Sequence, residues 1–177
     1  MGAPPAPLDA SEVPPADRLI APALVVVDMQ NDFVRAGAPL EVPDARETIG
    51  ANKNLLAAFR TRRLPVLYTR FLSREEDNLL WRWSPQCHPA TRACWPDHPR
   101  SYDDAPDPRP CADVIDELTP APGEAFHHGY ATTVVADAVS SFAPDLHAAT
   151  LRNFAMKFGW VADAGEVIAA LPPAGGE

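Results

Sequence analysis

The chain has 177 residues, a length that predicts one domain with a hydrophobic core of its own. Its formal net charge of −9 argues against nucleic acid and anionic membranes as partners, because both bind clustered Lys and Arg. No apolar run approaches the ~20 residues of a membrane span, and three cysteines without secretory features predict reduced thiols and a cytoplasmic location.

The 21 prolines of the chain fall mainly into two clusters. The first lies in residues 1–22, which we predict to be a disordered leader because they offer little to bury. The second lies between Pro85 and Pro122 and predicts a long loop, since proline lacks the N–H that regular structure needs. We therefore expect the folded domain at 23–171, followed by a flexible tail at 172–177.

The first half of the domain has a strand-helix-strand pattern. Residues 23–30, ALVVVDMQ, form an apolar run that ends in polar residues, as strands buried on both faces of a parallel sheet do. A helix follows, for which Asp44 and Glu47 predict a capping box. A second strand is predicted over 64–71, and this β-α-β order favours an α/β fold.

The second half has a similar alternation. A short helix is predicted over 111–118, and a strand over 132–138, TTVVADA. A longer helix should begin near Pro144 and lead into a short strand. A final helix is predicted from Asp163, with Glu166 completing a second capping box.

The join between Glu124 and Ala125 is abrupt. A turn-like segment precedes it, and only six residues, AFHHGY, separate it from the next predicted strand. Neighbouring parallel strands need a crossover of about a dozen or more residues, usually a helix. The middle of the sheet is therefore predicted to lack one unit, unless the strand at 132–138 pairs directly with the strand at 23–30.

Three stretches resemble the isochorismatase-like cysteine hydrolases: LVVVDMQNDFV at 24–34, VIDELTPAPGE at 114–124, and the whole of 125–163. The resemblance implies a three-layer α/β/α sandwich around a mostly parallel sheet, here without one central strand and helix. It also implies a cofactor-independent hydrolysis of small-molecule amides or related C–N bonds. In this family a Cys thiolate attacks the carbonyl, assisted by a Lys and by an Asp at the end of the first strand.

Asp28 matches the family Asp, at the carboxyl end of a strand where open α/β sheets bind their ligands. The family Lys and Cys have no match, because they would lie in roughly 40 residues that are absent between Glu124 and Ala125, somewhat more than a βαβ unit of ~30.

Other residues could replace the missing ones only with suitable geometry. The two lysines, Lys53 and Lys157, fall on predicted helices. Cys87, Cys94 and Cys111 fall in the proline-rich region, and a rewired hydrolase would use Cys94 or Cys111.

Three aromatic residues, Phe33, Trp81 and Trp83, are candidates for an apolar substrate pocket, and packing in the core is the alternative interpretation. Phe33 stands where the family often places an aromatic ring against the substrate. The adjacent His127 and His128 are interpreted as a solvated helix end.

A structural zinc site is the alternative role for the cysteine and histidine residues of the proline-rich region. Their spacings are looser than the short pairs of zinc sites, so no metal is predicted. The residues in question are Cys87, His88, Cys94, His98 and Cys111.

The leading hypothesis is therefore an internally deleted, catalytically impaired hydrolase of the isochorismatase-like family. The alternatives are a rewired hydrolase, and a non-enzymatic protein that binds a small ligand or modulates an oligomer. The expected partners are a small molecule and, if the chain folds, further copies of itself.

Overall fold

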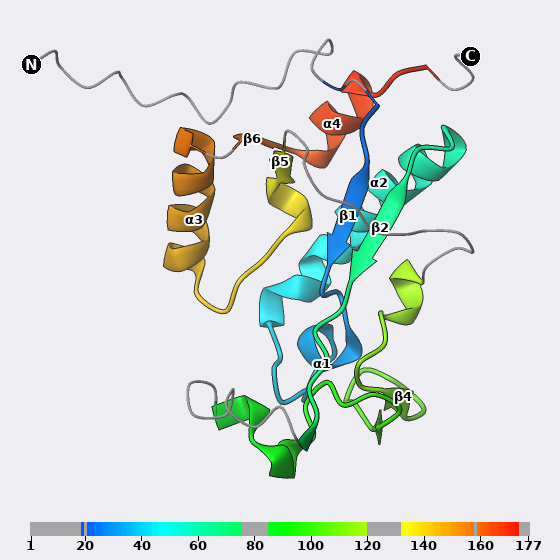
Figure 1. Ribbon diagram of the computed structural model, residues 1–177, viewed down its shortest axis with the longest axis vertical. Helices are drawn as coiled ribbons and strands as arrows, with labels where there is room; N and C mark the ends of the chain where they lie inside the picture. The colour runs from blue at the N-terminus through cyan, green and yellow to red at the C-terminus, as the bar shows by residue number, and fades with distance from the viewer. Residues whose placement is uncertain (1–18, 20, 76–84, 120–131, 158, 174–177) are drawn as a thin grey trace, which may run out of the picture.

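The computed structural model describes residues 19, 21–75, 85–119, 132–157 and 159–173, and it confirms a mixed α/β architecture (Figure 1). Within these ranges every helix is too short or too polar to cross a bilayer. The strands are β1 (Leu24–Val27), β2 (Val66–Thr69), β3 (Pro99–Arg100), β4 (Arg109–Pro110), β5 (Thr132–Val135) and β6 (Gly159–Ala162). The α-helices are α1 (Asn31–Val34), α2 (Ile49–Thr61), α3 (Pro144–Lys157) and α4 (Ala164–Ala170).

Strands β1 and β2 pair in parallel, as the sequence predicts, and α2 packs against both of them. Val26 and Val66 are buried in one core cluster with Leu55 and Phe59 of α2. Each such side chain contributes about 1.5–3 kcal/mol by leaving water. This core fixes the position of β1, and so of the residue that follows its carboxyl end.

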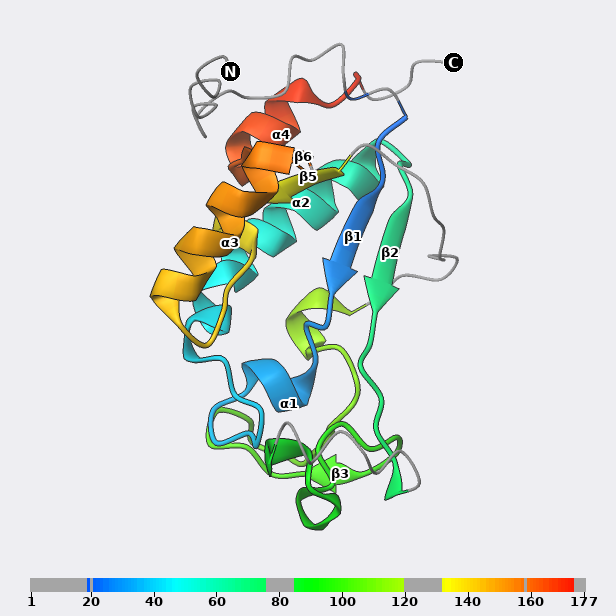
Figure 2. The ribbon, with the colours of Figure 1, turned by 60° about the vertical axis from the view of Figure 1, so that its left-hand side comes forward.

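The other face of β1 is uncovered. Val25 and Val27 are 50% and 60% exposed, so the prediction of a strand buried on both faces is wrong. Strands β5 and β6 form a second parallel pair, and in the described ranges the strands make three separate two-stranded sheets. Direct pairing of β5 with β1 is not seen there. Helix α2 contacts β1 on one side and α4 on another, which separates the two parallel pairs (Figure 2).

The two predicted capping boxes have different outcomes. At α4 the box is confirmed: the Asp163 carboxylate accepts from the Glu166 N–H at 2.8 Å, and the Glu166 carboxylate accepts from the Asp163 N–H at 2.9 Å. At α2 it is wrong, because Pro43 starts a 3₁₀ helix, Pro43–Thr48, that contains both residues of the predicted box and leads directly into α2.

The predicted helix over 111–118 is also wrong, since only Asp116–Leu118 forms a 3₁₀ turn. Residues 111–113 form a tight turn, in which the Asp113 N–H donates to the Pro110 carbonyl at 3.2 Å, and Val114 then forms an antiparallel bridge with Gln30 in the segment that follows β1. The Ile115 N–H donates to the Met29 carbonyl at 3.0 Å, and Ile115 is fully buried. The proline-rich region is thus attached to the core by tertiary contacts rather than by a helix of its own.

Asp32, in α1, makes the strongest of these attachments. Its carboxylate is fully buried and accepts hydrogen bonds from the Cys94 N–H at 2.8 Å, from Arg100 Nε at 2.8 Å and from the Tyr102 hydroxyl at 2.7 Å. Burial and the hydrogen bond to this carboxylate raise the pKa of Tyr102 well above its usual value, so the hydroxyl stays a donor. We call these four residues the Asp32 cluster.

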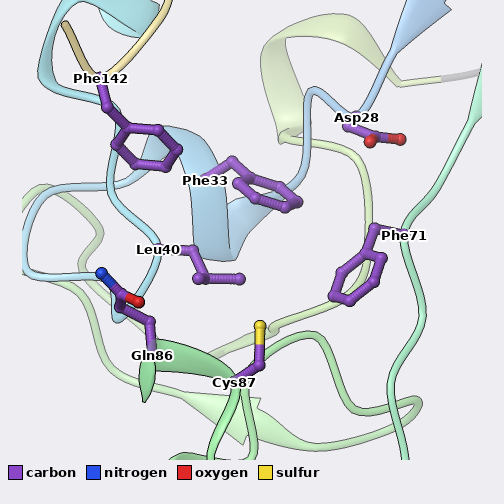
Figure 3. Close-up of a pocket in the computed structure, with 7 residues that line it drawn as sticks. All are labelled: Asp28, Phe33, Leu40, Phe71, Gln86, Cys87 and Phe142. Atoms are coloured by element: carbon purple, nitrogen blue, oxygen red, sulfur yellow. The ribbon is translucent and has the colours of Figure 1, made fainter. Parts of the chain in front are cut away.

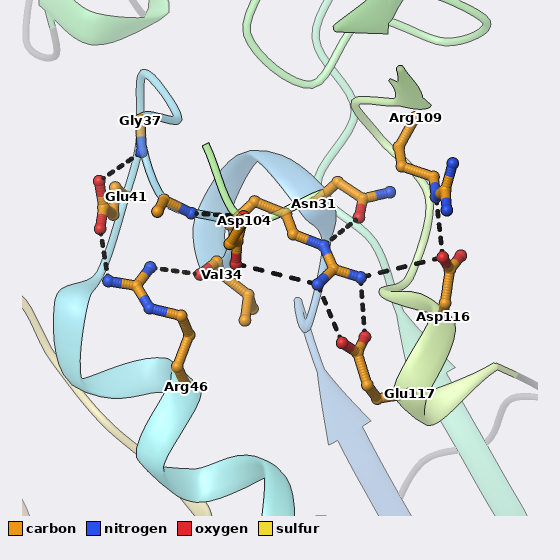
Figure 4. Close-up of polar contacts among 11 residues, drawn as sticks. Asn31, Val34, Gly37, Glu41, Arg46, Asp104, Arg109, Asp116 and Glu117 are labelled. Carbon is orange, nitrogen blue, oxygen red and sulfur yellow. Dashed lines mark hydrogen bonds and ion pairs between the residues drawn. The ribbon is translucent and has the colours of Figure 1, made fainter. Parts of the chain in front are cut away.

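Arg35, just after α1, makes a second attachment through Asn31 and Glu117, which are labelled in Figure 4. Its guanidinium donates to both carboxylate oxygens of Glu117, at 2.9 and 2.8 Å, and its Nε donates to Asn31 Oδ1 at 3.2 Å. Arg35 is only 6% exposed. A bidentate pair of this kind is among the stronger and more directional polar contacts in proteins. It holds the turn Asp116–Leu118 against α1.

We expect Asp32→Ala to lower the free energy of unfolding by about 3–5 kcal/mol, because the substitution leaves the Arg100 charge and the Cys94 N–H without their buried acceptor. Asp113→Ala is the matched control. It removes an acid whose pair with Arg70 is half exposed, and should cost at most about 1 kcal/mol. Urea denaturation of the full chain measures both, and equal losses would contradict the role assigned to Asp32.

Candidate functional site

Asp28 directly follows β1 and adopts a left-handed backbone conformation with φ of 51°. Its N–H donates to the Thr69 carbonyl at 3.3 Å and lies 3.2 Å from Thr69 Oγ1. The same hydroxyl donates to Asp28 Oδ1 at 2.7 Å. Few residues other than Gly adopt this conformation, and Asp tolerates it better than most. The end of β2 thus fixes the direction of the Asp28 side chain.

Asp28 lies on the wall of a pocket of about 400 Å³, which falls within the usual range of small-molecule sites (Figure 3). The structure brings Asp28 and Phe33, both predicted site residues, into this wall. The remaining predicted site residues, Trp81 and Trp83, lie outside the described residues, as do His127 and His128. The described residues that line it are Asp28, Phe33, Leu40, Phe71, Gln86, Cys87 and Phe142.

The rings of Phe33 and Phe71 meet edge to face, with centroids 6.2 Å apart. Buried Gln30 places the second of them. The Phe71 N–H donates to Gln30 Oε1 at 2.6 Å, and Gln30 Nε2 donates to the carbonyls of Phe71 and Ala112 at 2.9 Å. Gln30 is therefore a positioning residue that links the chain after β2 to the proline-rich region.

The sequence reasoning missed most of the lining. Phe71 follows a strand end, which is the one local signal that could have found it. Cys87 and Phe142 come from the proline-rich region and from the segment before α3, and no short motif contains them. Phe142 is 62% exposed and stands at the rim of the pocket.

The three cysteines differ in their surroundings. Cys94 and Cys111 are fully buried, whereas Cys87 is half-buried and lies in the pocket wall. Burial, followed by the negative charge of Asp32, raises the pKa of Cys94 well above its usual value and that of Cys111 to about 11. Because the thiolate is the nucleophile, these two thiols are poor replacements for the family Cys.

The histidine and cysteine residues considered for zinc make other contacts. His88 Nδ1 accepts from the Ala90 N–H at 3.1 Å, and the Cys111 thiol donates to the Trp95 carbonyl at 3.2 Å. In the part of the chain that the structure describes, no three His, Cys, Asp or Glu side chains are grouped to hold a metal ion. Of the two lysines, Lys53 is exposed on α2, and the Lys157 side chain lies outside the described part.

The family model "Isochorismatase domain" matches the chain over residues 22–127 and 123–166, which together span most of its length. The chain belongs to the isochorismatase family. The two matched segments overlap at 123–127, the residues that surround the join between Glu124 and Ala125. A comparison with curated proteins found no match.

Solved structures of isochorismatase-like proteins share the fold. A cysteine hydrolase from Pseudomonas syringae pv. phaseolicola is 17% identical with a TM-score of 0.68, covering 96% of this chain and 98% of its own. An isochorismatase-like hydrolase from Alkaliphilus metalliredigens is 18% identical with a TM-score of 0.67, covering 84% and 97%. N-carbamoylsarcosine amidase from Thermoplasma acidophilum is 21% identical with a TM-score of 0.58, covering 81% and 96%.

We expect iodoacetamide at neutral pH to label Cys87 well before Cys94 and Cys111, since the latter two are inaccessible and hold their protons. Peptide mapping by mass spectrometry of the full chain follows the order of labelling. In urea all three should react alike, and Cys87→Ser should remove the early label. Early labelling of Cys94 or Cys111 in the folded chain would contradict the burial described above.

Stability should fall as the pH rises above about 9. The unfolded chain releases its thiol protons near 9.0, whereas folded Cys111 keeps its proton up to about 11. The unfolded state then binds fewer protons, so the free energy of unfolding decreases, by up to about 1.4 kcal/mol per pH unit for each thiol. Urea midpoints between pH 7 and 11 test this, and Cys111→Ala should have a shallower slope than Cys87→Ala. Identical slopes would contradict it.

Proposed function

We propose that this chain descends from hydrolases of small-molecule C–N bonds, keeps their ligand pocket, and has lost their turnover. The observation that carries the proposal is that Asp28 lines the pocket without a basic side chain among the other described lining residues. The family mechanism needs a Lys and a Cys beside this Asp. The chain has neither the Lys nor the Cys at the matching positions.

The chemistry explains why one residue of the three is insufficient. The Asp carboxylate can transfer protons, but a thiolate must attack the carbonyl. That nucleophile and its base must lie within hydrogen-bonding distance of each other. The thiols of Cys94 and Cys111 are held neutral, and neither lines the pocket. The backbone donors that would stabilise the oxyanion belong, by the family resemblance, to the same absent segment as the Cys.

The arrangement of strands supports the absence of a whole unit of roughly 40 residues, somewhat more than the ~30 of a βαβ unit. In a three-layer sandwich the missing strand would pair with the free edge of β1, and a helix would cover the face on which Val25 and Val27 are exposed. The two parallel pairs then correspond to the two halves of an interrupted sheet. The two-part family match, which overlaps across this junction, supports the same interpretation.

A rewired hydrolase is the second candidate. The position of Cys87 favours a version that uses this thiol over one that uses Cys94 or Cys111. Cys87 lines the same pocket as Asp28. Its thiolate would add to the amide carbonyl, and the amine would leave with a proton delivered through Asp28. Water would then hydrolyse the thioester, which releases the acid and restores the thiol.

A non-enzymatic role in ligand binding fits the retained pocket equally well. A homo-oligomer, mixed oligomers with an intact relative, and a cytoplasmic location stay predictions from the sequence. Size-exclusion chromatography with light scattering, alone and with an intact relative, tests the first two.

Purified full-length protein should not hydrolyse small amides, ureides or N-carbamoyl amines above the rate of the Asp28→Asn variant, because the nucleophile is missing. Release of ammonia or amine measures turnover, with an intact amidase of the family and its own substrate as positive control. Turnover that is lost in Asp28→Asn would refute the proposal. If it is lost in Cys87→Ala as well, and kept in Cys111→Ala, the rewired mechanism is correct.

A further inference from the structure

Asp28 is the one charged residue among the described residues that line the pocket. The other lining side chains are apolar, aromatic, an amide and a thiol. From this juxtaposition we infer that the pocket selects a small organic cation with an aromatic or apolar body over a neutral amide of the same shape. The inference rests on the retained pocket of the proposed function, and it changes the class of ligand expected there.

Two arginines among the described residues are paired with carboxylates other than Asp28. Arg70 follows the residue that bonds Asp28, but its guanidinium pairs with Asp113 at 2.8 Å. Arg100 is held by Asp32 at 2.8 Å. Among the described residues no ion pair includes Asp28, whose one side-chain partner is the Thr69 hydroxyl. A ligand would therefore supply the cation that the described lining of the pocket lacks.

The carboxylate is oriented before a ligand arrives. Thr69 donates to Asp28 Oδ1, and the backbone of Asp28 is fixed to the end of β2. An amidinium or ammonium N–H can therefore meet a fixed acceptor. Hydrogen bonds between two charged groups are stronger than those to a neutral amide, and a planar amidinium can use both of its NH₂ groups.

The aromatic residues favour the same charge. Phe33, Phe71 and Phe142 all line the pocket, and Figure 3 shows the first two rings between Asp28 and Cys87. The face of a phenyl ring carries partial negative charge and attracts a cation placed over it. An anionic ligand would meet the Asp28 carboxylate, and the net charge of −9 works against it at longer range.

Three planar probes of nearly equal shape test the inference: benzamidinium, benzamide and benzoate carry charges of plus one, zero and minus one. Calorimetry or ligand-observed NMR on the full chain at neutral pH and low salt should give benzamidinium about ten-fold tighter binding than benzamide, with benzoate weakest. The benzamidinium affinity should fall as salt is added, while the benzamide affinity stays constant.

Asp28→Asn should bring the benzamidinium affinity down to that of benzamide. Asp107→Asn is the matched control, since it removes the same charge from an exposed loop outside the pocket lining, and it should keep the preference. Phe142→Ala, at the exposed rim, should weaken benzamidinium binding more than benzamide binding. If Asp28→Asn does not fold, the salt dependence on the wild-type chain still decides the question.

The two proposals fail in different ways. Equal affinity for benzamidinium and benzamide, with no turnover, would overturn the cation preference and leave the proposed function standing. A cation preference together with Asp28-dependent amide turnover would overturn the loss of catalysis and leave the preference standing. Absence of binding by all three probes would overturn the cation preference together with the retained pocket.

Discussion

Asp32 is fully buried, and its carboxylate holds three donors that belong to the proline-rich region. An unpaired charge at such a position would cost several kcal/mol, so the carboxylate and its donors must stay together for the fold to persist. This requirement places residues 94–102 against α1 although the region has little regular structure. Gln30 and Arg35 extend the same attachment on either side of α1. Loss of this attachment would loosen the region that carries Cys87, which forms part of the wall of the pocket.

The strands show a second constraint, which the chain meets only in part. A parallel strand is normally covered on both faces, because crossover helices lie on each side of the sheet. Here α2 covers one face of β1, whereas Val25 and Val27 of β1 stay exposed on the other face. The backbone edge of β1 opposite β2 likewise has no strand partner in the described ranges. Exposed edges and apolar faces of this kind are sites of association between chains, which gives the expected oligomer a physical basis.

The proposed loss of the family Lys and Cys would change the chemistry of the pocket. A carboxylate beside a lysine and a thiol is part of a hydrolytic centre. The same carboxylate, held by a threonine and surrounded by phenylalanines, is a fixed negative charge in an apolar recess. The proposed descent from a hydrolase and the inferred preference for cations are therefore compatible, since the proposal retains the negatively charged residue and removes the nucleophile.

The sequence by itself determined the α/β class, the order of the main strands and helices, the capping box at α4, and the place of Asp28 at the end of a strand. Each of these depends on periodicity or on residues close together in the chain, where local sterics and hydrogen bonding decide the outcome. Only the tertiary structure decided that β1 has an exposed face, that residues 111–113 form a turn instead of a helix, that Cys94 and Cys111 are buried, and that Cys87 and Phe142 reach the pocket. These features arise from contacts between segments tens of residues apart. Burial and desolvation are properties of the assembled neighbourhood rather than of the residue.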